Sequence, residues 1–495
     1  MAFDVRQATS RGLRRRLLSA CAAGLMLGCA GVDRELLEDL FEGGGHGHSG
    51  GGHGQGGHGG GGPRPGDCGF ISSDDVWRTV AADLATLDAD DQPFARYLTL
   101  ANQFNAGTCG EALDASRAAI DKLINSVSTS TTVSRLIAVD ADLTLYRLDL
   151  RDYDWDRAVD VDGTLFVDGW EAIVGSSPYA VAFAGADADD VKTGSETNVA
   201  VLFGDAFVAT ASSAPLYYGL LDIPEDVDGF IQDDLGIDVA ANRLEEEAVR
   251  AGLGGTGVGA LEFLVERHGI EFRTGSLWQI FSDENGAQAL IDDPLSTPPS
   301  EERELAFTLP NGLLAHVLAD ADGQRIDDSA LTLDTNETNF RATIARSYTS
   351  FRAQGVAPTD LLREIVLADP DRFEQEELEQ IRNIYPSAEE IDRIASADFS
   401  LTAASLEQLG LDPAAADPIG AAFLAFDRDV DAATAAAALY VSTEELLQNL
   451  NLLDPAMAVL DGGKLDRQDF DQLYAPSLCI LSVVSENAVD PEICD

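Results

Sequence analysis

Basic residues are scarce in this chain of 495 residues. Only 32 lysines and arginines stand against 86 acidic residues, which gives a formal net charge of −54. Nucleic acid and anionic membrane surfaces are therefore poor partners. The acidity is typical of adaptation to salty surroundings, where ions screen self-repulsion, and a cation-collecting role is the alternative. A hydrophobic content of 45% is sufficient for ordinary cores, and the length predicts two or three domains.

Histidine is nearly absent outside one glycine-rich stretch. The rest of the chain contains only His268 and His316. Outside the glycine-rich stretch the sequence contains no HExxH and no GxSxG, which excludes the hydrolase classes that these motifs define. We expect His268 to follow an apolar helix over Leu261–Val265, and His316 to lie in an apolar strand. Both are predicted to be structural.

The apolar run at the N-terminus is too short to span a bilayer. It covers Leu17–Gly28, follows the basic residues 14–16 and ends at Cys29. This order predicts a signal peptide over residues 1–28 and a lipidated Cys29. Cys21 is the competing site, but it would leave a very short apolar core. Ala30, rather than Asp, follows Cys29, which favours an outer-membrane lipoprotein held in the membrane through its lipid.

Glycine dominates the segment that follows the anchor. Residues 29–66 form the predicted tether, and Gly43–Gly62 within it cannot bury a core. Four imidazoles on this tether could chelate a divalent transition metal such as Zn²⁺, Cu²⁺ or Ni²⁺. The alternative is that they are polar spacers. These residues are His46, His48, His53 and His58.

Cysteine is also scarce, and four cysteines remain besides Cys21 and Cys29. An even number in an exported chain predicts disulfides, for which three pairings are possible. Proximity in sequence favours Cys68 with Cys109 and Cys479 with Cys494. None of the four lies in CxxC or CxxCH spacing, so neither a dithiol redox site nor an attached haem is indicated directly.

The folded part is predicted to be an α+β domain over residues 67–333, then a helical domain over 334–475 and a disulfide-bearing tail over 476–495. Hydrophobic periodicity changes between helix-like and strand-like segments in the first domain and is helical from Phe340 to Tyr474. The predicted helices of the first domain are Val76–Leu87, Gln92–Phe104, Glu111–Ser126, Pro224–Asp234 and Val239–Ala251. The predicted strands are Arg135–Val139, Leu143–Leu150, and the hairpin partners Ala306–Leu309 and Leu313–Leu318 around Pro310-Asn311-Gly312.

Several motif matches point to turns rather than to ligands. Residues 252–257 satisfy GxGxxG, but a helix is expected before them, where a dinucleotide-binding loop needs a strand. The Asp-Gly stretches at 160–163 and 320–323 lack the first Asp and the last Glu of a calcium loop. We expect a turn at each position.

Several stretches resemble exported bacterial cytochrome c-like proteins, which have an N-terminal globular region and one haem-attachment segment. The resemblance covers most of residues 70–475 and implies an all-α cytochrome c-like domain after the α+β domain. It is carried by Arg96-Tyr97, Asn105-Ala106-Gly107, Lys122–Ser126, Tyr146–Tyr153, Val208–Ala211, Ala214–Tyr217, Val265–His268, Leu309–Leu313 and Arg325–Asp327.

The chain departs from this family at the haem-attachment segment. Where the family has Ser-Cys-x-Ser-Cys-His, residues 347–352 have Tyr348 and Phe351 in place of the cysteines and Arg352 in place of the histidine. Without thiols no thioether bond can form, and a protonated guanidinium cannot ligate iron. We expect the two rings, with Ile344, to share one helical face and to fill the volume that the porphyrin leaves.

The sequence therefore predicts a haem-less, lipid-anchored relative of these cytochromes, with no catalytic residues and no cofactor other than the lipid. It would act by binding an unidentified protein or small molecule, or in a cell-envelope assembly. One alternative is an electron-transfer protein that holds haem non-covalently through His268. The other is a hydrolase that acts on envelope polymers through paired carboxylates.

Overall fold

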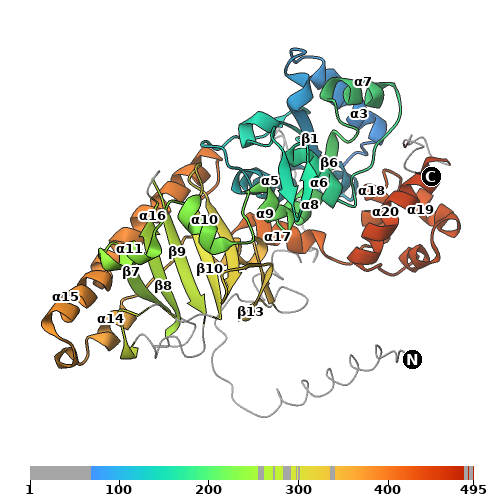
Figure 1. Cartoon of the computed structure of the whole chain (residues 1–495). Coiled ribbons are helices and arrows are strands. Elements are labelled where there is room, and N and C mark those ends of the chain that lie inside the picture. The colour runs from blue at the N-terminus through green and yellow to red at the C-terminus, as the bar shows by residue number, and fades with distance from the viewer. Residues whose placement is uncertain are drawn as a thin grey trace, which may run out of the picture. The chain divides into compact units, whose positions relative to one another are not determined.

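The computed structural model describes residues 68–254, 261–270, 274–282, 291–296, 298, 301–334, 341–483, 489 and 494 (Figure 1). The predicted signal peptide, Cys29 and the four tether histidines lie outside these residues. Within them, an α+β region is followed by helices, as the sequence predicts.

A mixed four-stranded sheet organises the first region, in the order β2-β3-β1-β6. Strand β1 (Ala95–Thr99) pairs antiparallel with β3 (Leu145–Asp149) and parallel with β6 (Val201–Phe203), and β2 (Ile137–Ala138) forms an edge. A separate hairpin joins β4 (Val159–Val161) and β5 (Thr164–Phe166). The helices are α3 (Ser73–Leu84), α4 (Ala101–Asn105), α5 (Asp114–Ser126), α6 (Gly169–Ser176), α7 (Ala186–Ser195), α8 (Gly204–Ala211), α9 (Leu216–Leu220), α10 (Val227–Asp233) and α11 (Val239–Leu244).

A six-stranded antiparallel sheet follows, in which neighbours in sequence are neighbours in space. Its predicted hairpin is confirmed, because β10 and β11 pair directly and Gly312 takes a positive φ of 89° in the turn between them. A small ladder of β13 (Asp328–Leu333) and β14 (Arg341–Thr343) leads to the helices. The strands of the large sheet are β7 (Val249–Gly254), β8 (Leu261–Gly269), β9 (Ser276–Ser282), β10 (Glu302–Thr308), β11 (Leu314–Asp320) and β12 (Arg325–Ile326).

The C-terminal helices contribute to several cores. Helices α14 and α15 pack on the large sheet, where Leu362 and Ile381 share a core with Leu264, and α16 supplies Ile391 to the separate core of Val265. Residues of α18 and α20, such as Tyr474, share a core with Trp77 of α3. The domain boundary at residue 334 stays a prediction. These helices are α13 (Arg346–Phe351), α14 (Leu361–Val366), α15 (Gln375–Ile384), α16 (Ala388–Gln408), α17 (Pro418–Phe426), α18 (Ala432–Ala438), α19 (Thr443–Asn449) and α20 (Arg467–Ser482).

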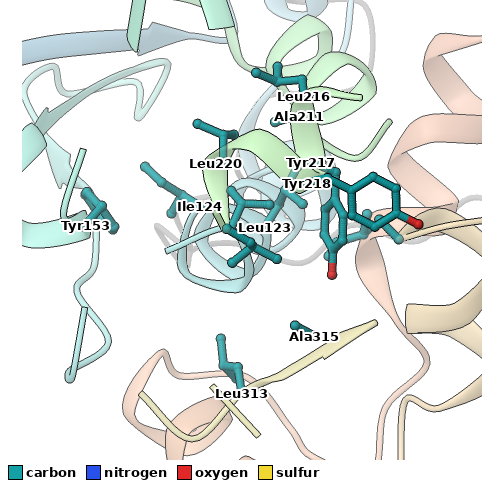
Figure 2. Packing of buried hydrophobic residues seen from close by; sticks show 14 of the residues in the cluster. Leu123, Ile124, Tyr153, Ala211, Leu216, Tyr217, Tyr218, Leu220, Leu313 and Ala315 are labelled. Carbon is teal, nitrogen blue, oxygen red and sulfur yellow. The ribbon is translucent and has the colours of Figure 1, made fainter. Parts of the chain in front are cut away.

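The central core joins α5, α8 and α9 to the large sheet (Figure 2). Figure 2 shows Tyr217 and Tyr218 of α9 above Ala315 of β11, and Leu313, which precedes that strand, below Leu123 of α5; all belong to one hydrophobic core. The Tyr217 hydroxyl accepts a hydrogen bond from the His316 backbone N–H at 3.0 Å, and the Tyr218 hydroxyl donates one to the backbone carbonyl of Ile326 at 2.7 Å. Both phenols are therefore buried with their polar ends satisfied.

Two helix predictions are wrong in part, and a third is wrong throughout. The segment Gln92–Phe104 contains β1, whose five residues are all buried and so show no alternation. The predicted helix Val239–Ala251 ends at Leu244, and its last residues belong to β7. Residues 261–265 lie in β8. Leu264 and Val265 are buried in different cores on the two faces of the sheet. The strand therefore lacks the alternation of apolar and polar residues that identifies a half-exposed strand.

The helical prediction from Phe340 also needs correction, because β14 precedes α13. The GxGxxG motif begins inside β7 rather than after a helix, and the next described element is the antiparallel strand β8. A phosphate-binding turn would need a helix there, so the motif still gives no support to a nucleotide site. The Asp-Gly stretches are turns as predicted, with positive φ at Gly163 and Gly323.

The favoured disulfide pairing is confirmed. Cys68 and Cys109 are joined at an S–S distance of 2.06 Å, and Cys479 and Cys494 at 2.16 Å. Each bond closes a loop at one end of the described chain.

Candidate functional site

The segment predicted to be a degenerate haem-attachment site forms helix α13. Tyr348 is buried at 2% exposure, and its ring lies 6.4 Å from that of His316 and 5.7 Å from that of Phe351. Phe351 is 40% exposed, and Ile344 precedes the helix. The expected shared face is therefore wrong, because only Tyr348 and Ile344 fill interior volume.

Arg352 neutralises a buried carboxylate. Its Nη2 lies 2.6 Å from Oε2 of Glu304, and its Nε lies 3.1 Å from Oε1. Glu304 is 4% exposed, and Nδ1 of His316 lies 3.4 Å from Oε1. Burial alone would raise the pKa of Glu304, but Arg352 and His316 outweigh it and hold the pKa below its ordinary value.

The second globular histidine belongs to another buried network. His268 is fully buried, with Nε2 3.0 Å from Glu266 Oε1 and Nδ1 3.3 Å from the Asn242 amide nitrogen. Arg243 and Arg250 also bind the Glu266 carboxylate, each at 2.7 Å. Although burial opposes it, the His268 hydrogen bond and the two guanidinium groups hold the pKa of Glu266 far below its ordinary value.

These residues do not fit a haem. The described cysteines are consumed in disulfides, so they offer no thiols for thioether bonds. Arg352 is engaged by Glu304, and both ring nitrogens of His268 have partners inside a closed network. Across the described ranges, no group of three or more His, Cys, Asp or Glu side chains is placed to hold a metal ion.

A cleft of about 330 Å³ lies beside the start of α13, and we call it the Arg346 cleft. Segments far apart in the chain form the cleft, namely the ends of α6, α8 and α17 together with residues of α13 and α20. It contains charged groups of both signs, hydroxyls and aromatic rings. Its lining residues are Ser176, Pro178, Tyr179, Ala209, Thr210, Ser213, Ala214, Pro215, Leu216, Arg346, Phe423, Phe426, Asp427 and Asp471.

A strained turn positions Arg346. Ala345 has φ 63° and ψ −60°, and the Arg346 N–H donates to the Ile344 carbonyl at 2.8 Å, which is the rare γ-turn with positive φ. Such strain persists only where the surroundings impose it, and it concentrates at functional sites. The Arg346 guanidinium lies 3.9 Å from the centre of the Phe423 ring, and its Nη2 lies 3.2 Å from the Thr343 hydroxyl.

Tyr179 and Asp471, which line the same cleft, form a hydrogen-bonded triad with Arg467. The Tyr179 hydroxyl donates to Asp471 Oδ1 at 2.6 Å and accepts from Arg467 Nη1 at 2.8 Å. Arg467 also stacks on Phe426 at 4.4 Å. The Tyr179 hydroxyl thus links Arg467 to Asp471, whereas Arg467 Nε stays buried without a hydrogen-bond partner among the described residues. Burial raises the pKa of Tyr179.

Asp427 lies at the C-terminal end of α17 and its carboxylate makes no hydrogen bond or ion pair with the described residues. The loop that carries it is tied to the loop before α20, because Val430 and Leu465 exchange backbone hydrogen bonds of 2.7 and 2.8 Å. Partial burial raises the pKa of Asp427, against the attraction of Arg346 and Arg467. Burial also raises the pKa of Asp471, and the charge of Asp427 adds to this effect.

The hydroxyl groups of the cleft are left as acceptors. Thr210 and Ser213 donate to backbone carbonyls one helical turn earlier, both at 2.8 Å, and Ser176 does so at 2.9 Å. Their oxygen lone pairs remain for a ligand that brings hydrogen-bond donors.

No pattern in the sequence pointed to Arg346, Tyr179, Asp427 or Asp471 as site residues. One signal was present, since the stretches Val208–Ala211 and Ala214–Tyr217, which carry the family resemblance, supply five lining residues of the cleft. The charged residues have no spacing that would bring them together before the fold is known.

Comparisons of the chain with protein-family models, with curated proteins and with solved structures give no match. In the part of the chain that the structure describes, none of the helices combines the length and apolar character needed to cross a membrane.

Proposed function

We propose that this protein is an acidic, lipid-anchored protein of the outer membrane that carries no haem and binds a small polar ligand in the Arg346 cleft. The anchor is supported by the basic residues, the short apolar run and Cys29 at the N-terminus. The loss of haem attachment is supported by Tyr348 and Phe351 at the cysteine positions of the related cytochromes and by the pairing of Arg352 with Glu304.

One observation carries the binding role. The strained turn at Ala345 positions Arg346, which directly precedes the degenerate segment, at a cleft that Tyr179, Asp427 and Asp471 also line. Convergent polar groups and perturbed carboxylates in a cleft are typical of a ligand site.

The binding role is tested by thermal shift with a library of small amino acids, dipeptides, sugars and carboxylates. We expect at least one member to raise the melting temperature of the mature protein and of Arg428→Gln, an exposed neighbour outside the cleft. Arg346→Gln should lose most of that shift. If no compound gives a shift that depends on Arg346, the binding role is wrong.

The anchor and the absence of haem have separate tests. Cys29→Ser should abolish partitioning into detergent, whereas Cys21→Ser should not. Purified mature protein should show no Soret band. A Soret band that His268→Ala removes would instead establish the alternative of non-covalent haem binding.

A second function, hydrolysis of an envelope polymer, is favoured by one observation. Asp427 and Asp471 line the same cleft, both with raised pKa values, and the charge of one raises the pKa of the other. An acid and a base made from two carboxylates need such a relationship. Cleavage of purified peptidoglycan that both Asp427→Asn and Asp471→Asn abolish would support hydrolysis, and unchanged cleavage in either variant would exclude this pair.

A further inference from the structure

We infer that the Arg346 cleft binds an uncharged sugar, with a single hexose ring as the part that enters it. The inference rests on the proposed binding function and names the class of its ligand. It follows from the hydrogen-bonding state, the charges, the apolar walls and the size of the cleft.

The hydroxyl groups that line the cleft have given their protons to partners within the protein. Three of them are aliphatic and donate to backbone carbonyls four residues earlier, at 2.8 to 2.9 Å. The fourth belongs to Tyr179, which donates to Asp471 Oδ1 at 2.6 Å. The aliphatic hydroxyls are those of Ser176, Thr210 and Ser213. Their oxygens can therefore meet a ligand only as acceptors.

A carboxylate adds acceptors to the same surface. Asp427 makes no hydrogen bond or ion pair with the described residues, so both of its oxygens can accept hydrogen bonds. Together with the hydroxyl oxygens of Thr210 and Ser213, it gives the cleft more acceptors than donors. Such a cleft suits a ligand that brings several hydrogen-bond donors of its own.

The charges of the cleft favour donors without charge. Asp427 and Asp471 line it, and the charge of Arg467 acts on both, while that of Arg346 acts on Asp427. An ammonium group would be attracted by two carboxylates and repelled by two guanidinium groups. A ligand carboxylate would need donors from Arg346, which already donates to the Thr343 hydroxyl at 3.2 Å, and the formal net charge of −54 repels anions. Neutral hydroxyl groups meet neither repulsion.

The remaining walls are apolar and suit the C–H faces of a sugar ring. Half of the fourteen lining residues have hydrocarbon or aromatic side chains, among them Pro178, Pro215 and Phe426. A hexose carries hydroxyl groups around its edge and C–H groups on its faces. It therefore matches a cleft in which a few polar groups lie among apolar ones.

The volume admits one sugar unit. A cleft of about 330 Å³ corresponds to roughly eleven water molecules at their liquid volume of about 30 Å³ each. A hexose has about that many heavy atoms. A longer glycan would have to extend past the mouth.

The test measures binding of D-glucose, D-galactose and D-mannose by calorimetry. We expect at least one of these hexoses to bind. Its fully O-methylated derivative should bind at least about tenfold more weakly, because it has the same ring but no hydroxyl donors. The amino sugar and the uronic acid with the same ring should bind no more tightly than the neutral hexose.

Two variants inside the cleft locate the binding. Thr210→Val removes an acceptor at nearly constant shape, and Asp427→Asn removes a charge and one acceptor oxygen. Each should weaken binding of the hexose by about fivefold or more. Thr193→Val is the matched control for the first, because this exposed hydroxyl of α7 also donates four residues back, at 2.8 Å, and lies outside the cleft. Asp469→Asn, an exposed carboxylate of α20 outside the cleft, is the control for the second.

Equal affinity for the hexose and its O-methylated derivative would overturn the sugar assignment. Tighter binding of the amino sugar or the uronic acid would overturn it too, as would unchanged affinity in both cleft variants. If no hexose binds while another library compound gives an Arg346-dependent thermal shift, the sugar assignment is wrong and the binding function stands.

If no library compound gives such a shift, the proposed function fails and the sugar assignment fails with it. Weaker binding in Thr210→Val counts only if its unfolding midpoint matches that of Thr193→Val. Otherwise Asp427→Asn and the O-methylated probe decide the outcome.

Discussion

Arg352 and Glu304 form a two-point ion pair between the end of α13 and strand β10, with contacts of 2.6 and 3.1 Å. Glu304 is 4% exposed, and the guanidinium group offsets the free-energy cost of burying its negative charge. Arg352 thus stabilises the large sheet through its contact with β10.

Arg352→Met should destabilise the protein by about 3–5 kcal/mol at neutral pH, because it leaves a buried carboxylate without its partner. Urea unfolding of the purified protein measures this change. The double variant Arg352→Met with Glu304→Gln should recover part of the loss. A single variant as stable as the wild type would show that the ion pair has no structural role.

The ion pair also predicts the acid response. The folded-state pKa of Glu304 lies below its ordinary value of 4.5. Its contribution to stability is therefore present above that pH and is lost as the pH falls through the folded-state pKa. In the Arg352→Met variant this part of the acid dependence should disappear in urea unfolding series between neutral pH and the acid range.

Asp427→Asn should stabilise the protein at neutral pH while it weakens ligand binding. The pKa of Asp427 is raised in the folded state, so ionised Asp427 disfavours folding, and this penalty is relieved as the pH falls through the raised pKa. Thermal melts at several pH values should show a higher midpoint for the variant at pH 7 that converges with the wild type in acid. Equal midpoints at pH 7 would contradict the prediction, and Asp469→Asn serves as control.

Ala345→Gly should raise stability by about 0.5–1 kcal/mol, because glycine adopts φ 63° without the strain that a Cβ causes. Ala342→Gly, in strand β14 a few residues earlier, should instead lower stability by about 1 kcal/mol. Chemical denaturation of both variants compares them directly. A loss of stability in both would mean that the turn at Ala345 is unstrained.

Removal of either disulfide should lower stability through the entropy of the unfolded chain. The loops have sequence separations of 41 and 15 residues, which predict losses of about 4 and about 3 kcal/mol for the double serine variants. Urea unfolding with and without dithiothreitol measures both. An unfolding midpoint that does not respond to the reductant would argue against bonds that constrain the chain.

Local signals in the sequence predicted local structure well. The hairpin around Asn311, the Asp-Gly turns and the pairing of neighbouring cysteines depend on residues close together in the chain. Strand β8 was missed because Leu264 and Val265 are both covered, so the two-residue alternation of a half-exposed strand is absent.

The candidate site could not be predicted, because tertiary packing assembles it. Tyr179, Arg346 and Asp471 are separated by more than a hundred residues each, and all three lack a motif. The family resemblance singled out residues 347–352, and Arg346, the residue before them, lines the cleft. The arginines and their acidic partners lie far apart in the chain, so these ion pairs can be identified only from the fold.

The core shared by Trp77 and Tyr474 has a consequence for the order in which the chain folds. The first sheet emerges early in synthesis, yet one of its apolar faces stays open until α18 and α20 follow. The protein therefore completes its amino-terminal half last, after nearly the whole chain has appeared. Loss of α20 by proteolysis or by a premature stop would expose that early sheet to aggregation.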